Sequence, residues 1–335
     1  MMKFWSRCPQ VAMAALALTA VSLATPWTPS AHAQDWPNRP VTLVIPFAPG
    51  SASDVVGRVF AARLSEVLGQ QVVVENVGGA GGTIGVTRVS KATPDGYQFV
   101  MGGIDTFAMS KALYKKLPYD PVADFMPVAM VAEQPIVLLV RKDLPAKDLK
   151  EFVAYGKANP GKLKYGSAGV GSASHLACAQ LNAAAGIDAL HVPYRGSAPA
   201  VQDAIAGRLD FICALGAAAV PQIESQTLKP LAALTKERSV LLPQIATATE
   251  QGVAFEAPFW SGFFVPKGTP QEVVDKLQKA TVALIETPGL AEKLTKVGST
   301  FVAPDRRSTA YLKSFLDSEI AKWGETIKAS GVSLD

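Results

Sequence analysis

The alternation of strand-like runs with helical patterns constrains the fold of this 335-residue chain more than any other feature. Val41 to Phe47 is a nearly continuous apolar run, which is typical of a strand covered on both faces. From Asp54 to Leu68 apolar residues recur at helical spacing, and Gly69 provides a natural helix end. A strand, a short turn and a helix in this order predict a parallel sheet with helical crossovers.

The alternation runs through two series. The first adds predicted strands at 71–75 and 97–101 and a helix at 83–91. The second predicts strands at 163–167, 189–194, 210–213 and 228–234, with helices at 174–185, 198–206 and 217–226. The tail adds helices at 271–286, 288–297 and 308–329. The sequence therefore predicts an α/β fold with two lobes, each a mainly parallel sheet flanked by helices.

Extended segments that contain proline, at 128–140 and 234–243, separate the two series. We expect residues 34–130 to form the first part of lobe one and residues 131–235 to form lobe two. Residues 236–335 are then expected to return to lobe one. A chain of this kind places a cleft between its lobes, which is a usual position for a small ligand.

The N-terminus has the pattern of a secretory signal. Lys3 and Arg7 precede an apolar run from Val11 to Ala24, and Ala31-His32-Ala33 offers small residues for cleavage. The run is too short to span a bilayer, which argues against a membrane anchor. We predict that residues 1–33 are a signal peptide cut after Ala33, that the mature chain works in the periplasm, and that it has no membrane insertion.

Composition narrows the possible ligands. The 32 Lys and Arg residues against 28 Asp and Glu leave a net charge of +4 without a basic stripe, which argues against nucleic-acid binding. Scattered His and Cys residues argue against a structural metal site, and no cofactor is expected. Cys178 and Cys213 are the cysteines of the mature chain. An oxidising compartment permits a disulfide between them, but both can equally be small core residues.

Each lobe begins with a Gly/Ser turn that joins a buried strand to a helix. The first turn is Ala48-Pro49-Gly50-Ser51-Ala52-Ser53, and the second is Ala168-Gly169-Val170-Gly171-Ser172-Ala173. A helix N-terminus offers unpaired N–H groups and a partial positive charge, so two facing turns can hold a carboxylate without an arginine. The alternative is that Ser53 and Ser174 only cap their helices.

Enzyme motifs have weak support in the sequence. The glycines of residues 79–85 miss the dinucleotide spacing by one residue, and Tyr165 stands where a nucleophile elbow needs Gly. His175 and His191 have no spaced Asp and Ser partners that would indicate a triad, which favours structural roles. A secreted α/β hydrolase that uses Ser51 or Ser172 stays an alternative.

Several longer motifs follow one another along the mature chain. They are Trp36-Pro37-Asn38-Arg39-Pro40, Val44-Ile45-Pro46-Phe47, Val74-Glu75-Asn76, Pro94-Asp95-Gly96-Tyr97, residues 112–120 (ALYKKLPYD), His191-Val192-Pro193-Tyr194-Arg195-Gly196 and Lys267-Gly268-Thr269-Pro270. In these motifs the chain resembles the Bug family of periplasmic solute receptors, which are associated with tripartite tricarboxylate transporters. The resemblance covers Trp36 to Val332.

The resemblance implies a two-lobed type II periplasmic binding-protein fold that closes on a small carboxylic acid. It also implies which residues hold the ligand carboxyl group. These are Gly50, Ser51, Ala52, Ser53 and Asp54 in lobe one, and Ser167, Gly171, Ser172, Ser174 and His175 in lobe two. For Asp54, a helix-capping role is the alternative.

The chain departs from the family pattern at three places. Ala48 and Ser51 replace one residue each of the usual double Pro and double Gly. A stretch that is usually rich in Ser and Thr and ends in His contains Asp105, Thr106 and Phe107, so we expect Asp105 and Thr106 at the ligand and Phe107 near the cleft. For Asp105, a capping or surface carboxylate is the alternative. Ala214-Leu215 replaces a frequent Asp-Asn pair. A more apolar acid fits these changes, although Asp105 repels an anionic ligand that carries no donor or cation.

The sequence thus predicts a monomeric receptor that captures a small organic acid and delivers it to membrane transporter subunits. A receptor that serves a sensor kinase is the alternative within the same family.

Overall fold

The computed structural model describes residues 1–2 and 36–330. The predicted signal cleavage site therefore lies outside the described residues. Contacts divide the chain into two units, Met1–Trp36 and Pro37–Asp335, and the fold below is that of the second unit. Across residues 36–330, no helix has both the length and the apolar character needed to cross a membrane.

Lobe one is built on a six-stranded sheet with the strand order β11-β4-β10-β3-β1-β2. Its strands are β1 (Val41–Ile45), β2 (Val72–Asn76), β3 (Gln98–Gly103), β4 (Phe125–Gln134), β10 (Phe259–Pro266) and β11 (Thr300–Phe301). Its helices are α1 (Ala52–Leu68), η1 (Ala80–Gly82), α2 (Thr83–Ser90), the π-helical segment η2 (Ile104–Met109), α3 (Ser110–Leu113), α8 (Gln271–Ile285), α9 (Leu290–Lys296), η3 (Pro304–Arg306) and α10 (Thr309–Ser330). The first and last of these elements along the chain, β1 and α10, thus belong to the same lobe.

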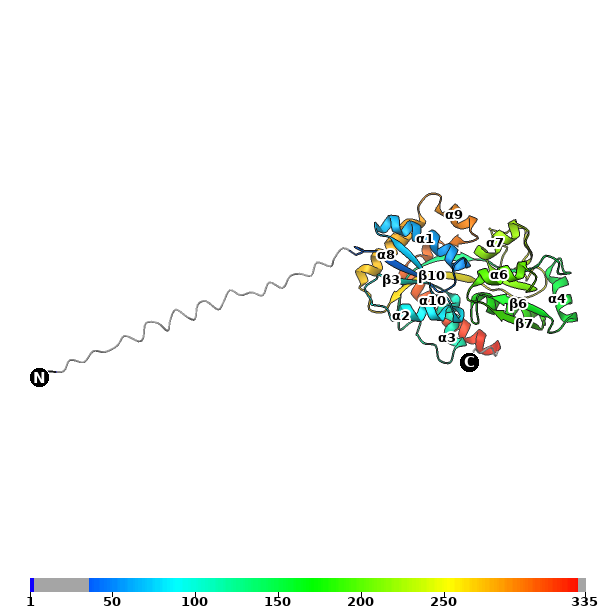
Figure 1. The fold of residues 1–335 in the computed structure, drawn as a ribbon, viewed down its shortest axis with the longest axis horizontal. Helices are drawn as coiled ribbons and strands as arrows, with labels where there is room; N and C mark the ends of the chain where they lie inside the picture. Colours follow the sequence, from blue (N-terminus) through cyan, green and yellow to red (C-terminus); the bar gives the residue numbers. More distant parts are fainter. Residues whose placement is uncertain (3–35, 331–335) are drawn as a thin grey trace. The chain divides into compact units, whose positions relative to one another are not determined.

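Lobe two is built on a five-stranded sheet with the strand order β7-β6-β8-β5-β9. Its strands are β5 (Ile136–Arg141), β6 (Leu163–Ser167), β7 (Ala189–Pro193), β8 (Phe211–Leu215) and β9 (Leu228–Ala233). Its helices are α4 (Leu149–Ala158), α5 (Ala173–Ala185), α6 (Ser197–Ile205) and α7 (Gly216–Glu224). Figure 1 shows these middle elements, in green, gathered apart from the blue and orange elements of lobe one.

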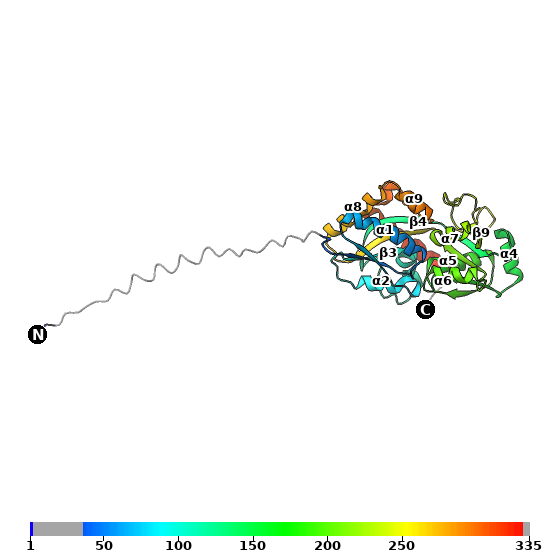
Figure 2. The same ribbon diagram turned by 45° about the horizontal axis from the view of Figure 1, so that its top comes forward.

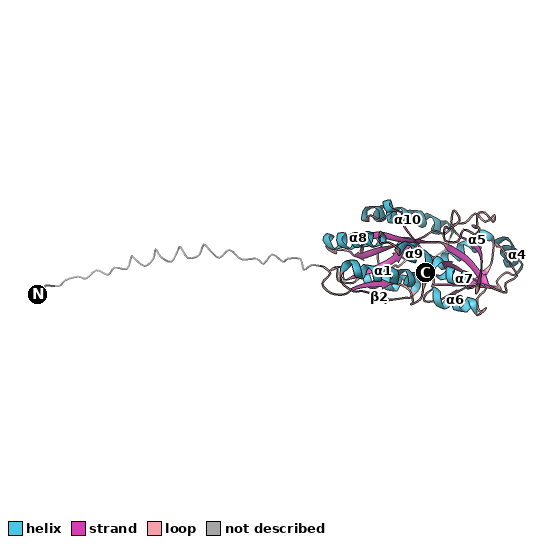
Figure 3. Cartoon of the chain, turned by 90° about the horizontal axis from the view of Figure 1, so that it is seen from above, coloured by secondary structure: helices cyan, strands magenta, loops and turns pink. Residues whose placement is uncertain are grey.

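Helices cover both sheets, which confirms the predicted two-lobed α/β fold. Figure 2 shows α1 and α8 side by side on lobe one, and Figure 3 shows helices on both sides of the strands. Every residue of β10 is buried, as expected for a strand between two helical layers.

Both sheets are mixed, and the prediction that they are mainly parallel was wrong in this detail. β1 pairs in parallel with β2 and β3, whereas β10 runs antiparallel to β3 and β4. In lobe two β6 is parallel to β7 and β8, but β5 is antiparallel to β8 and β9. Two of the antiparallel strands, β5 and β10, follow a passage between lobes, whereas the short strand β11, antiparallel to β4, follows α9 within lobe one. A strand that arrives from the other lobe needs no helical crossover, so it is free to pair antiparallel.

The extended segment predicted at 128–140 is two strands, β4 and β5, joined at Pro135. The chain passes there from the first sheet to the second, and it returns through residues 234–258 to β10. Proline lacks an N–H group and interrupts pairing, so it separates two strands that otherwise form one apolar run.

Candidate ligand-binding site

The first Gly/Ser turn leads from β1 into α1, and Ser51 is the residue before the helix. Gly50 has a φ of 74°, which a residue with a side chain rarely adopts. Asp54 fixes the conformation of the turn. Its carboxylate accepts hydrogen bonds from the Gly50 N–H (2.8 Å), Arg58 (3.0 Å) and Asn76 (2.9 Å). Burial opposes ionisation, but these bonds outweigh it and keep the pKa of Asp54 below its ordinary value. Asp54 thus braces the turn.

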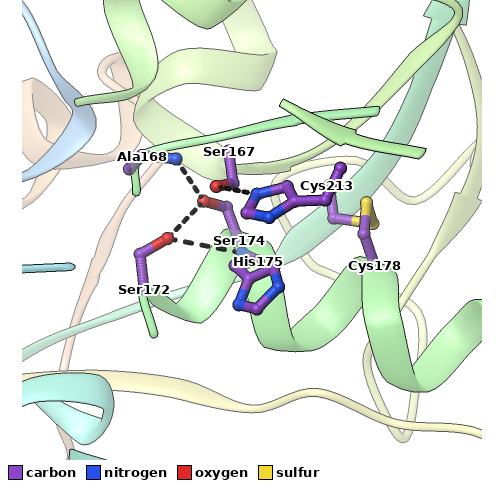
Figure 4. Close-up of a disulfide and its surroundings, with 8 residues drawn as sticks. Ser167, Ala168, Ser172, Ser174, His175, Cys178 and Cys213 are labelled. Atoms are coloured by element: carbon purple, nitrogen blue, oxygen red, sulfur yellow. Dashed lines mark hydrogen bonds between the residues drawn. A yellow bond between two sulfur atoms is a disulfide. The ribbon is translucent and has the colours of Figure 1, made fainter. Parts of the chain in front are cut away.

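The second turn leads from β6 into α5. Ser172 caps the helix, because its Oγ accepts from the His175 N–H at 3.4 Å and donates to the Gly169 carbonyl at 2.7 Å. The His175 Nδ1 accepts from the Gly171 N–H at 3.2 Å. Figure 4 shows Ser172, Ser174 and His175 together at this end of the helix.

A disulfide fixes α5 to the sheet. Cys178, within α5, is bonded to Cys213 in β8, with Cα atoms 5.5 Å apart (Figure 4). The structure thereby decides between the two alternatives that the sequence left open. Because Cys178 lies less than two turns beyond Ser172, the bond holds the N-terminus of α5 in place relative to lobe two.

A cavity of about 20 Å³ lies where the two helix N-termini meet. It is lined by Phe47, Ser51, Ala52, Ser53, Asp105, Ala168, Ser172, Ala173, Ser174, Ser197 and Leu215. This volume is enough for about one water molecule. The lobes therefore stand closed around the site.

Each helix N-terminus donates a hydrogen bond to a side chain of the opposite lobe. The Ala52 N–H at the start of α1 donates to Ser197 Oγ of lobe two at 3.1 Å. The Ala173 N–H at the start of α5 donates to Asp105 Oδ2 of lobe one at 3.1 Å. The two N-termini thus act as hydrogen-bond donors across the cleft, which is the behaviour expected of an anion site.

Half of the predicted site residues line this cavity. They are Ser51, Ala52, Ser53, Asp105, Ser172 and Ser174. The other six do not line the cavity. Gly50, Asp54, Gly171, His175 and Ser167 form or support the two turns, and the Ser167 Oγ accepts from the Gly169 N–H at 3.1 Å. Thr106 instead caps η2, where its Oγ1 accepts from the Gly103 N–H at 3.0 Å.

The groups that could hold an anion at this site are backbone N–H groups and hydroxyl groups. Among residues 36–330, no basic side chain lines the cavity, and the charged residue that does is Asp105. Burial lowers the pKa of His175 to about 4, so this imidazole is neutral at pH 7. A bound carboxylate would therefore be held by N–H groups, hydroxyl groups and the helix dipoles rather than by a side-chain cation.

Ser167 and His191 form a pair that the sequence did not reveal. The Ser167 Oγ lies 2.7 Å from His191 Nε2, and the His191 ring stacks on His175 with centroids 4.0 Å apart. Burial, with the neighbouring His175 adding to it, lowers the pKa of His191 to about 4. Ser167 is 2% exposed and does not line the cavity, so the pair supports the second turn rather than facing a ligand.

Two positions differ from the predictions, Ser197 and Phe107, and one, Leu215, agrees with them. Ser197 was missed, although it follows β7 in the same strand, glycine and helix order as the two recognised turns. Leu215 lines the cavity, as the departure from the family pattern suggested. The placement of Phe107 near the cleft was wrong: its ring is fully buried in lobe one and stacks on Phe264 with centroids 3.7 Å apart. Stacking in an aromatic cluster buries more apolar area than a wet cleft would allow.

A larger hollow of about 480 Å³ lies beside α10 and β4. Its lining includes Trp260, Arg306 and Glu319, but no residue of either turn. Arg306 is already bound to Glu133 at 2.7 Å and to the Tyr311 hydroxyl at 2.9 Å. The smaller cavity, where hydrogen-bond donors from both lobes converge, is therefore the candidate ligand site.

Two sheets joined by two passages of chain, with helix N-termini meeting between them, define the class of two-lobed type II periplasmic binding proteins. A family model described as "Tripartite tricarboxylate transporter family receptor" matches residues 56–332. The chain belongs to this family, as predicted from its sequence, and the family consists of periplasmic solute-binding proteins.

Solved structures agree with this assignment. The periplasmic binding protein BugD is 37% identical, with a TM-score of 0.86 over 89% of this chain and 99% of BugD. MatC (Rpa3494) from Rhodopseudomonas palustris, with bound malate, is 37% identical, with a TM-score of 0.84 over 87% of this chain and 99% of MatC. R. palustris Rpa4515 with adipate is 34% identical, with a TM-score of 0.85 over 89% of this chain and 99% of Rpa4515.

Proposed function

We propose that this chain is a periplasmic receptor that captures a small carboxylic acid by closure of its two lobes. The observation that carries the proposal is the pair of helix N-termini, α1 and α5, that donate hydrogen bonds into one cavity from opposite lobes. A carboxylate placed between them would connect the lobes and favour the closed form. The malate and adipate held by MatC and Rpa4515 support a small acid as the ligand.

The receptor would hold its ligand at the turn residues that line the cavity, namely Ser51, Ala52 and Ser53 in lobe one and Ser172 and Ser174 in lobe two. Because the closed cavity has room for about one water, a ligand must enter while the lobes are apart. Opening and closing would then be part of each binding cycle, as in hinged binding proteins generally.

The partner would be a tripartite tricarboxylate-type transporter, and the closed receptor would deliver its ligand to it. The receptor itself would act as a monomer. The family description supports a transporter, and the signal-like N-terminus supports export to the periplasm with cleavage after Ala33. A sensor kinase is the alternative partner. A deletion strain that loses uptake of the acid indicates transport, whereas one that loses only gene induction indicates signalling.

A thermal-shift screen of the purified protein tests the receptor function. The panel contains dicarboxylic, aromatic and amino acids, amides and sugars. A ligand that binds only the folded state raises stability by about 2.7 kcal/mol at a hundred times its dissociation constant. Stabilisation by acids, with the compound recovered unchanged, is the expected result. If no acid raises the melting temperature, the result contradicts the carboxylate site. If a compound is converted, the result favours the hydrolase alternative.

A further inference from the structure

The carboxylate of Asp105 stands where lobe two would receive an anion. Asp105 belongs to η2 of lobe one, yet its Oδ2 accepts the Ala173 N–H at the start of α5, at 3.1 Å. Its Oδ1 accepts the Thr106 N–H at 2.9 Å. The residue is 3% exposed and lines the cavity. One of the two helix N-termini in the cleft is therefore already occupied by a negative charge from the chain itself.

Among the described residues, no cation of the cavity lining balances the charge of this carboxylate. The N–H groups of Ala173 and Thr106 donate to it, and its own N–H and the Thr106 side chain also favour its charged form. Within the part of the chain that the structure describes, no lysine, arginine or histidine lines the cavity to neutralise it. Burial raises the pKa of Asp105 to about 6, so at pH 7 the group is still mostly ionised. A buried carboxylate without a cationic partner favours the binding of a ligand that brings a positively charged hydrogen-bond donor.

At the other N-terminus, that of α1, the carboxylate of Asp54 is paired with Arg58 at 3.0 Å and does not line the cavity. At the start of α1, the Ala52 N–H donates to a neutral hydroxyl, that of Ser197. The Ser53 hydroxyl also lines the cavity, and this residue is buried. Lobe one thus keeps room for a ligand carboxylate, whereas lobe two offers an acid. The cleft is electrically asymmetric.

We propose that Asp105 selects the ligand class: a small zwitterion, with its carboxylate at the α1 turn and its ammonium group against Asp105. A dicarboxylic acid would bring its second carboxylate against Asp105. Two like charges within about 4 Å at a partly shielded site weaken binding on the order of 100-fold or more. The inference rests on the proposed receptor function, and it specifies that function's substrate class.

Titration calorimetry with matched compounds tests this selection. The probes are straight-chain ω-amino acids, dicarboxylic acids of the same carbon number and simple monocarboxylic acids, together with small α-amino acids. Wild type is compared with Asp105→Ser, which removes the charge, and with Asp105→Asn, which keeps the side-chain volume if the serine variant folds poorly. Asp317→Ser, at an exposed carboxylate on α10, is the control for loss of one negative charge.

We expect wild type and the Asp317→Ser variant to bind a zwitterion at least 10-fold more tightly than the dicarboxylic acid of equal length. In the Asp105 variants that preference should fall at least 10-fold, through weaker zwitterion binding and stronger dicarboxylate binding. Two results would overturn the proposed selection but not the receptor function. One is a wild type that binds dicarboxylic acids more tightly than zwitterions. The other is a ratio of the two affinities that differs by less than threefold between wild type and the Asp105 variants. If no acid of any kind binds to any variant, the receptor function itself is wrong.

Discussion

Asp105 should make the ligand-free protein less stable as the pH rises through its titration range. Burial raises the pKa of Asp105 from 3.8 to about 6, although the N–H groups of Ala173 and Thr106 oppose the rise. The folded protein therefore binds this proton more tightly than the unfolded chain does, so the free energy of unfolding falls as the pH rises. One pKa unit corresponds to about 1.4 kcal/mol, which gives a total loss of about 3 kcal/mol between about pH 4 and pH 6.

The Asp105→Asn variant isolates this contribution. It removes the titrating group but keeps its volume, and the loss of one acceptor for an N–H group lowers its stability by a nearly constant amount at every pH. His175 and His191, whose pKa values are about 4, titrate in both proteins and cancel in the comparison. The variant should therefore gain about 3 kcal/mol relative to wild type as the pH rises from about 4 to about 7.

Urea unfolding at several pH values, followed by circular dichroism, measures the difference. Asp317→Asn serves as the control for removal of a negative charge from an exposed site. Curves for wild type and Asp105→Asn that stay parallel from about pH 4 to about pH 7 would refute the reasoning. They would show that water reaches Asp105 in the ligand-free protein, and therefore that the lobes stand open in solution.

Three further changes test the parts that position the site. Replacing Cys178 and Cys213 together by Ala removes a bond that spans 35 residues of sequence. Chain entropy then predicts a loss of about 4 kcal/mol of unfolding free energy, and a loss under about 1 kcal/mol in urea unfolding would contradict it. In Gly216→Ala, the new Cβ would overlap the Gly298 carbonyl of lobe one, so ligand affinity measured by calorimetry should fall at least tenfold. Gly324→Ala, which has nothing near its new Cβ, is the control. Equal affinities of the two variants would show that closure does not require the close contact of Gly216 with Gly298. Ser53→Ala removes a hydroxyl group that lines the cavity, and the loss of a hydrogen bond to a charged group should weaken carboxylate binding about tenfold with an unchanged melting temperature. Unchanged affinity in that variant would place the carboxylate elsewhere.

Much of the fold was predictable because its signals are local. The apolar run at β1, the glycine after α1 and the breaker-rich turns each depend on a few neighbouring residues. β10 was not predicted, although all eight of its residues are buried, because Ser261 and Gly262 interrupt its apolar run and the helices that follow dominate the tail. The antiparallel pairing of β5 and β10 depends on how the lobes are connected, which no local pattern records.

The two turns were predictable for the same reason. A strand, glycines, serines and a helix start lie within about ten residues of each other, and they predict exposed N–H groups whichever lobe they face. The contacts that complete the site are of another kind. Asp105 meets Ala173 across 68 residues of sequence, and Ser197 meets Ala52 across 145. Such pairs are formed only when the lobes close, so spacing along the chain carries no signal for them.

This division between local and distant contacts bears on specificity. The N–H groups of the two turns come from the backbone, and substitutions in the turns change them little as long as the glycines allow the conformation. They suit carboxylates in general. Discrimination between acids must therefore come from side chains that lobe closure brings against the ligand, chiefly Asp105, Ser197 and Leu215. Two receptors with the same turns can thus accept acids whose second groups carry opposite charges, and under the proposed selection Asp105 is the residue of this chain that decides between them.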